Sequence, residues 1–156
     1  MRFSLRLNND LRLSQYQALA QTAETTGFDQ FWVSHDLFLR SASVILPVVA
    51  QATKQIEIGS CIFNPYTINP AELAMFAATM DELTGNRFNL GLAAGAKEFL
   101  GWIGLRQKGP LAAMRESVSA IRLLLAGERV PLDGQFLHWE RDAYLRFQAA
   151  RVTPIY

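Results

Sequence analysis

Residues 56–70 read Ile-Glu-Ile-Gly-Ser-Cys-Ile-Phe-Asn-Pro-Tyr-Thr-Ile-Asn-Pro, and this stretch decides the fold. Its first half predicts a buried strand, because the β-branched residues Ile56, Ile58 and Ile62 recur at a period of two. The residues at 59–61 are small, so a flat ligand could lie against the exposed backbone at the end of this strand.

The second half of the stretch cannot continue the strand. Pro65 and Pro70 have no backbone N–H group, and Asn64 favours a turn. Asn69 followed by Pro70 predicts the start of a helix, with Asn69 as the N-cap and Pro70 in the first helical position. A strand, a polar loop and a helix therefore follow one another here.

The rest of the chain repeats this unit of strand, loop and helix. Alternating apolar residues predict strands, and apolar residues three and four apart predict helices. Residues 130–147 predict a hairpin turned at Asp133-Gly134, and residues 152–156 resemble the start of another buried strand. The predicted strands are 2–8, 30–34, 56–62 and 87–93, and the predicted helices are 14–26, 41–53 (or 43–53), 70–83 and 110–126.

Regular alternation of strands and helices predicts an α/β fold with a parallel sheet, either doubly wound or a barrel. A doubly wound sheet should be apolar on both faces, whereas three of these strands carry a small or polar second face. A TIM (β/α)8 barrel explains this pattern, because one face of each strand packs against the helices and the other points into the interior of the barrel. We therefore predict that Arg6 and Glu57 lie inside the barrel and offset each other's charge.

The helix predicted over residues 110–126 is the most regular in the chain. Apolar residues recur along it at a spacing of three and four, which predicts one face packed on the core. That face is expected to contain Leu111, Met114, Val118, Ile121 and Leu125.

The composition is that of an ordinary globular domain. Apolar residues make up 50% of the 156 residues and charged residues 19%, and the net charge is +1. This charge gives no reason to expect a nucleic acid or membrane partner. Cys61 is the only cysteine, which favours a reducing compartment, and no signal peptide is recognisable at the start. We expect one domain and a cytoplasmic location.

Four segments are similar to a known family. Residues 28–34 (FDQFWVS) resemble a strand of the bacterial luciferase-like monooxygenase superfamily. Residues 59–70 (GSCIFNPYTINP) and 77–88 (AATMDELTGNRF) resemble its coenzyme F420-dependent branch, which is typified by methylenetetrahydromethanopterin reductase, and residues 123–128 also fit. The similarity covers nearly the whole chain.

This resemblance implies a TIM barrel that binds coenzyme F420, or alternatively FMN, at the C-terminal ends of its strands. It implies an oxidoreductase that moves a hydride between F420 and a small organic substrate, with an FMN-dependent monooxygenase as the alternative. It also implies a cis peptide bond between Cys61 and Ile62, in a bulge beneath the cofactor ring.

The resemblance also suggests site residues. His35 and Asp36 are the candidate catalytic residues, although related enzymes commonly carry them in the order Asp-His. Asn64 and Thr67 are candidates for binding the cofactor, but their side chains could bond only to the backbone of their own turn. Cys61 has no basic partner that would make it a nucleophile. No metal-ligand pattern is present. The candidate cofactor-binding residues are Asn8, Ser34, Cys61, Ile62, Asn64, Thr67, Ala94, Gly95 and Ala96.

The chain is shorter than the predicted barrel. A TIM barrel has eight strand–helix units in typically about 250 residues. This sequence supplies about four units and the start of strand five, the N-terminal half. We expect a fragment of a longer protein, and a homo-oligomer in solution; a non-catalytic half-barrel that retains only cofactor binding is the alternative.

Overall fold

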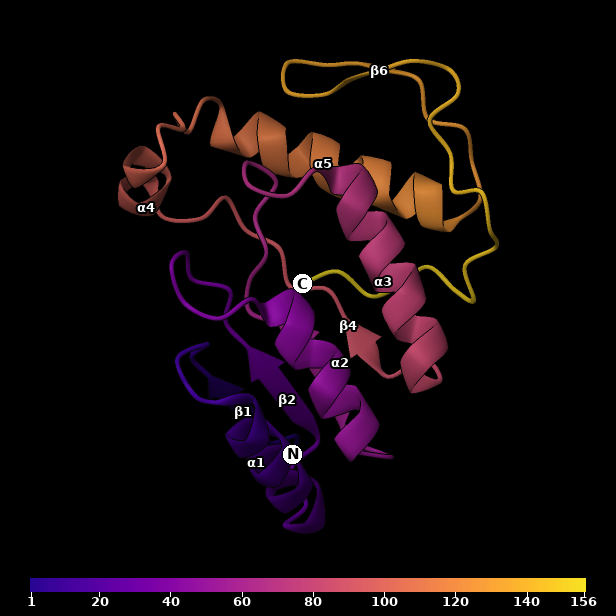
Figure 1. The fold of residues 1–156 in the computed structure, drawn as a ribbon. Helices are drawn as coiled ribbons and strands as arrows, with labels where there is room; N and C mark the ends of the chain where they lie inside the picture. Colours follow the sequence, from indigo (N-terminus) through magenta and orange to yellow (C-terminus); the bar gives the residue numbers. More distant parts are fainter.

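A computed structural model describes residues 1–156 and contains a four-stranded parallel sheet in the order β1-β2-β3-β4. A helix follows each of the first three strands (Figure 1). The strands are β1 (Ser4–Leu7), β2 (Gln30–Val33), β3 (Glu57–Ser60) and β4 (Phe88–Asn89), and these helices are α1 (Leu13–Thr25), α2 (Ala42–Ala52) and α3 (Pro70–Thr84). The predicted α/β fold with a parallel sheet is confirmed.

The segment after β4 contains two more helices, α4 (Lys97–Trp102) and α5 (Pro110–Leu125). A short antiparallel pair, β5 (Leu132–Asp133) and β6 (His138–Trp139), follows them. The chain then returns to the sheet, where Ile155 forms a parallel bridge with Leu90. The predicted start of a fifth strand is therefore present beside β4. No helix is long and apolar enough to cross a membrane.

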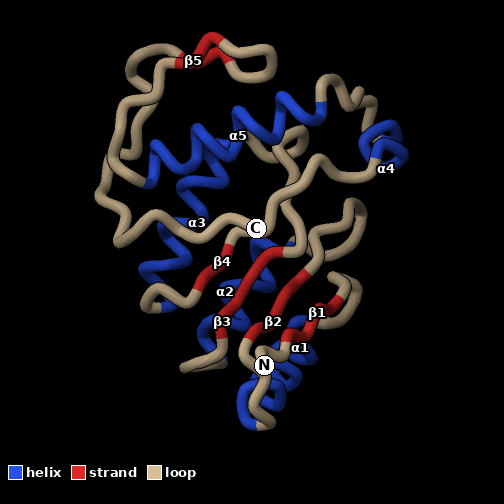
Figure 2. Tube along the Cα trace, turned by 180° about the vertical axis from the view of Figure 1, so that it is seen from behind, coloured by secondary structure: helices blue, strands red, loops and turns tan.

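The core lies between the sheet and its helices, which cover one face of the sheet (Figure 2). Alternate strand residues, among them Phe31, Ile58 and Phe88, are fully buried there. Asn69 caps α3 as predicted, since its side chain accepts a hydrogen bond of 2.9 Å from the N–H of Ala71. These contacts fix which side chains the opposite, inner face of the sheet presents.

The inner face carries a ladder of polar side chains around Glu57. The Glu57 carboxylate forms an ion pair with Arg2 and accepts hydrogen bonds from Gln30 and Asn89 at 2.8 and 3.0 Å. Burial alone would raise the pKa of Glu57, but these hydrogen bonds and the charge of Arg2 lower it overall. The predicted pairing of Glu57 with Arg6 is therefore wrong, because Glu57 is neutralised by Arg2.

The strand register explains this difference. Gln30 pairs with Ser4 on one side and Glu57 on the other, whereas Arg6 lies two residues further along β1, level with Trp32. The predicted inner-face position of Arg6 is correct, but its side chain is too far along the strand direction for Glu57 and instead lies at the C-terminal end.

Asp81 joins residues 151–153 to α3. Asp81 is buried in α3, and its carboxylate accepts two hydrogen bonds from Arg151, at 2.9 and 3.1 Å, and one of 2.6 Å from the hydroxyl of Thr153. Arg151 also donates to the carbonyl of Phe88. A buried carboxylate is stable only with such partners, so this cluster holds residues 151–153 in place.

The later part of the chain differs from the sequence-based prediction in two respects. Leu111 is 72% exposed, because α5 packs on α3 through smaller residues such as Ala113, Ser117 and Ala120. The hairpin turns over residues 134–137 rather than at Asp133-Gly134, because the Glu116 carboxylate accepts hydrogen bonds of 2.9 Å from the N–H groups of residues 135–137.

We predict that Glu24 stabilises the start of β3. Its carboxylate accepts hydrogen bonds from the N–H groups of residues 54–56, and although burial opposes it, these bonds lower the pKa of Glu24 below 4.5. Its stabilising effect is therefore complete above that pH and is lost as the pH falls. Glu24→Gln should lower the free energy of unfolding by about 1 kcal/mol at pH 7 and by much less at pH 3.

Urea unfolding at the two pH values measures this effect. The control is Glu82→Gln, on the exposed side of α3, which should change stability little at either pH. Equal losses in the two variants, or a loss in Glu24→Gln that does not depend on pH, would contradict the prediction.

Candidate functional site

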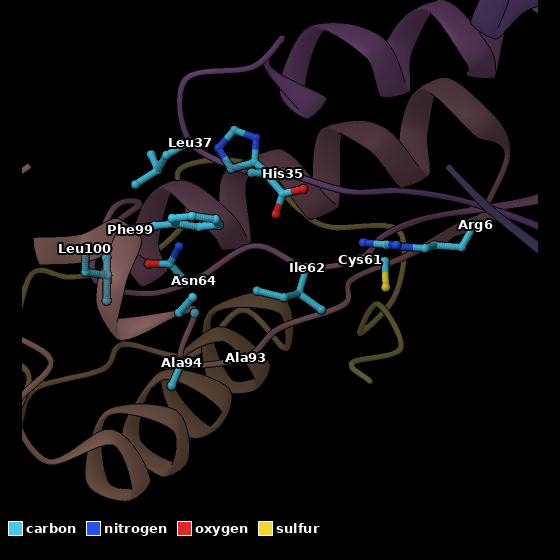
Figure 3. A pocket seen from close by; sticks show the side chains of 13 residues that line it. Arg6, His35, Leu37, Cys61, Ile62, Asn64, Ala93, Ala94, Phe99 and Leu100 are labelled. Carbon is cyan, nitrogen blue, oxygen red and sulfur yellow. The ribbon is translucent and has the colours of Figure 1, made fainter. Parts of the chain in front are cut away.

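A cavity of about 460 Å³ lies at the carboxyl ends of the parallel strands (Figure 3). Ligand sites of parallel α/β folds lie at this end of the sheet. Its lining is mostly apolar, with a few polar groups, which is typical of a binding site for a small organic molecule. The lining residues are Arg6, His35, Asp36, Leu37, Cys61, Ile62, Asn64, Ala93, Ala94, Gly95, Ala96, Phe99 and Leu100.

The segment after β3 forms one wall of this cavity. The peptide bond between Cys61 and Ile62 is cis, as expected. The N–H of Cys61 still bonds to the carbonyl of Val33, at 2.7 Å, whereas the N–H of Ile62 has no partner within the protein. Cys61 and Ile62 both line the cavity, so the strand leaves the sheet at the point where the cavity begins.

Asn64 lines the cavity and also closes its own turn. Its Oδ1 accepts hydrogen bonds from the N–H groups of Tyr66 and Thr67, at 3.2 and 3.0 Å. Its Nδ2 donates to no protein atom and lies against Gly95, where an added Cβ would stand 3.3 Å from it. Asn64 therefore combines the structural role with an amide donor that remains free for a ligand.

Residues 94–96 form the adjoining wall, in the loop between β4 and α4. Gln107 holds this loop, because its Nε2 donates to the carbonyl groups of Ala94 and Gly95, both at 2.9 Å. The N–H groups of Ala94 and Gly95 have no partner within the protein. Sequence reasoning did not identify Gln107, since nothing in its local pattern indicates a contact with residues 12 and 13 positions earlier.

His35 and Asp36 both line the cavity. They could have pointed to opposite faces, but β2 ends at Val33 and the chain no longer alternates there. The ring of His35 packs edge-on against Phe63, with centroids 5.0 Å apart, and its Nδ1 accepts a hydrogen bond of 3.2 Å from the N–H of Ala42. Burial lowers the pKa of His35 below 6.5, although Asp36 opposes the shift, so the ring is neutral at pH 7 with its proton on Nε2.

Asn9 positions this loop from the turn that follows β1. Its side chain is fully buried, and its Nδ2 donates to the carbonyl groups of Asp36 and Arg40 at 2.9 and 2.7 Å. Its Oδ1 accepts a hydrogen bond from the N–H of Asp36. The sequence indicated only that Asn9 ends a strand, because a contact 27 residues away leaves no local signal.

Three of the suggested cofactor-binding residues do not line the cavity. Thr67 donates its hydroxyl hydrogen bond within its own turn, to the carbonyl of Asn64. Asn8 is exposed at the end of β1, where its carbonyl accepts a hydrogen bond from Tyr16. Ser34 is fully buried, and its hydroxyl has no hydrogen-bond partner. A role for these three residues in cofactor binding stays a prediction.

The sequence and the fold of this chain are similar to those of known reductases. Over 156 aligned residues it is 33% identical to 5,10-methylenetetrahydromethanopterin reductase from Archaeoglobus fulgidus, covering 100% of this chain and 46% of that relative. The solved structure of coenzyme F420 dependent tetrahydromethanopterin reductase from Methanopyrus kandleri matches with a TM-score of 0.90 at 25% identity, covering 99% of this chain and 49% of the other.

A flavin protein has the same fold at lower identity. The oxygenating constituent of 3,6-diketocamphane monooxygenase from Pseudomonas putida, solved in complex with FMN, matches with a TM-score of 0.78 at 19% identity, covering 99% of this chain and 48% of the other. This chain thus spans about half the length of the relatives that it matches. Since the model of the luciferase-like monooxygenase family also matches residues 1–156, the chain belongs to that family.

Proposed function

We propose that this chain supplies the cofactor-binding half of an oxidoreductase that transfers a hydride between coenzyme F420 and a small organic substrate. The observation that carries the proposal is the cavity at the strand ends, whose walls combine apolar side chains with free hydrogen-bond donors. The similarity to an F420-dependent reductase of known structure supports a deazaflavin, and the FMN complex makes FMN the alternative.

The lining residues fit a flat ring system. Ile62, Ala93 and Ala94 all line the cavity, where their small or apolar side chains can pack against a ring face (Figure 3). Carbonyl groups on the ring edge can accept hydrogen bonds from Asn64 Nδ2 and from the free N–H groups of the loop at residues 94–95. When bound, F420 would supply the hydride chemistry, and these residues would hold it and exclude water.

His35 is the proposed proton-donating residue of the site. Its Nδ1 is occupied by the N–H of Ala42, so the proton on Nε2 is the one available to a ligand. Because burial keeps the ring neutral, it can donate a hydrogen bond to a developing anion on the substrate without a change in its charge. Asp36 lies beside it in the cavity and would orient the substrate.

Replacing the free amide of Asn64 tests cofactor binding. Asn64→Asp keeps an acceptor for the two N–H groups of its turn but removes the Nδ2 donor, so F420 affinity should fall by roughly tenfold with little loss of stability. Fluorescence titration with F420, and separately with FMN, gives both affinities. The control is Asn69→Asp, which keeps the helix cap at a position outside the cavity. It should bind F420 and FMN as tightly as the wild type does. Equal affinities in all three proteins would contradict the proposed donor.

Gly95 offers a second test that does not change any polar group. Gly95 and Gly104 have nearly the same positive φ, 75° and 76°, so alanine causes the same backbone strain at both. Only at Gly95 would the added Cβ press on Asn64, at 3.3 Å, whereas Gly104 has open space. Gly95→Ala should therefore weaken F420 binding by roughly threefold or more, compared with Gly104→Ala. Equal effects would exclude Gly95 from the ligand-bearing wall.

Catalysis by His35 is tested with variants of the whole protein, at the length that its natural source makes. His35→Asn should lower the rate of F420-dependent hydride transfer by roughly 100-fold while F420 affinity changes less than about threefold, since acid–base groups act on the chemical step. His138→Asn, in the exposed hairpin, is the control and should retain full activity. An unchanged rate in His35→Asn would remove this residue from the mechanism.

A further inference from the structure

Three aromatic side chains form a continuous surface at the mouth of the cavity, which we call the aromatic shelf: Phe38, Phe99 and Trp102. The ring centroids of Phe99 and Trp102 are 4.9 Å apart, and those of Phe38 and Trp102 are 6.1 Å apart. Phe38 and Trp102 are 69% and 68% exposed. Large exposed aromatic side chains that lie in contact commonly mark a binding surface.

The position of Phe38 is imposed by the backbone around it. Its φ is +66°, a conformation that costs a residue with a bulky side chain roughly 1 kcal/mol or more. The buried side chain of Asn9 holds both flanks of this turn, through the carbonyl groups of Asp36 and Arg40. The fold thus keeps an aromatic ring at a place where neither burial nor backbone preference favours it.

The shelf continues the wall of the cavity. Phe99 lines the cavity, as does Leu37, the neighbour of Phe38. The helix α4, which carries Phe99 and Trp102, lies beyond the carboxyl ends of the strands (Figure 2). A substrate whose reacting end lies in the cavity beside Phe99 could therefore extend outward along the shelf without leaving apolar surface.

We propose that the aromatic shelf binds a flat aromatic group of the substrate. This inference rests on the proposed function and names the substrate class: molecules in which a flat, unsaturated ring system adjoins the reacting centre. Aromatic faces pack well against such rings, in offset or edge-to-face contact. The size of the shelf favours a small molecule, because a stable protein interface buries about 800 Å² on each partner, more than these three partly exposed rings supply.

The experiment compares two neutral probes with one carbon skeleton, flat 2-naphthol and saturated decahydro-2-naphthol. Ligand-observed NMR gives the affinity of each for the wild type and for Phe38→Asn, Trp102→Ala and Phe147→Asn. Asparagine tolerates the positive φ at position 38, so Phe38→Asn removes the ring without destabilising the turn. Phe147 is a 42% exposed phenylalanine outside the shelf and serves as the control.

The wild type should bind 2-naphthol at least roughly threefold more tightly than the saturated probe. Phe38→Asn and Trp102→Ala should each remove that preference and leave F420 affinity within about twofold, whereas Phe147→Asn should change neither. A wild type without preference, or shelf variants that keep it, would overturn the proposal. The proposal would also be overturned if the wild type formed a dimer, or bound neutral lipid vesicles, and the shelf variants did not.

The two proposals fail separately. A wild type that binds F420 but shows no preference for 2-naphthol would reject the shelf but not the cofactor site. A preserved naphthol preference in a protein that binds neither F420 nor FMN would reject the proposed function and leave an aromatic-ligand site at the end of the sheet.

Discussion

The structure depends on the close approach of β3 and the chain after β4 at Gly91. A Cβ on Gly91 would lie within 2 Å of the carbonyl oxygen of Ser60, at 1.9 Å, so only glycine permits this spacing. The hydroxyl of Ser60 accepts from the N–H of Gly91 at 3.0 Å and donates to its carbonyl at 3.1 Å. The bridge between Phe63 and Leu92 then brings the two walls of the cavity together.

Much of the fold could be predicted from the sequence because its determinants are local. The alternation of Ile56 and Ile58 indicates the strand, and Asn69-Pro70 marks the start of the next helix. The later segments were harder because distant residues decide them. Glu116 reaches the hairpin from 19 or more residues away, and small residues such as Ala113 let α5 approach α3 with Leu111 turned outward. Neither effect has a periodic signal.

In the candidate site, too, the features that depend on local sequence were predictable and those that depend on distant residues were not. The strand ends, the small residues at 94–96 and the turn at Asn64 were visible in the sequence, and the structure brings them to one cavity. The residues that fix this geometry were not visible. Asn9 and Gln107 act through hydrogen bonds to backbone carbonyl groups across the chain, and such contacts do not depend on the identity of the residue that accepts them. A single sequence therefore identifies the residues that line the site better than the residues, such as Asn9 and Gln107, that hold its loops in place.

The cluster of Asp81, Arg151 and Thr153 has a consequence for the order of folding. Its hydrogen bonds join residues 70 and 72 positions apart in the chain, while α3 and β4 are neighbours in sequence. A growing chain that packed α3 early would bury the carboxylate of Asp81 without its partner, at a high desolvation cost. Final packing of α3 is therefore expected to await residue 151, which makes α3 and residues 151–153 one cooperative unit.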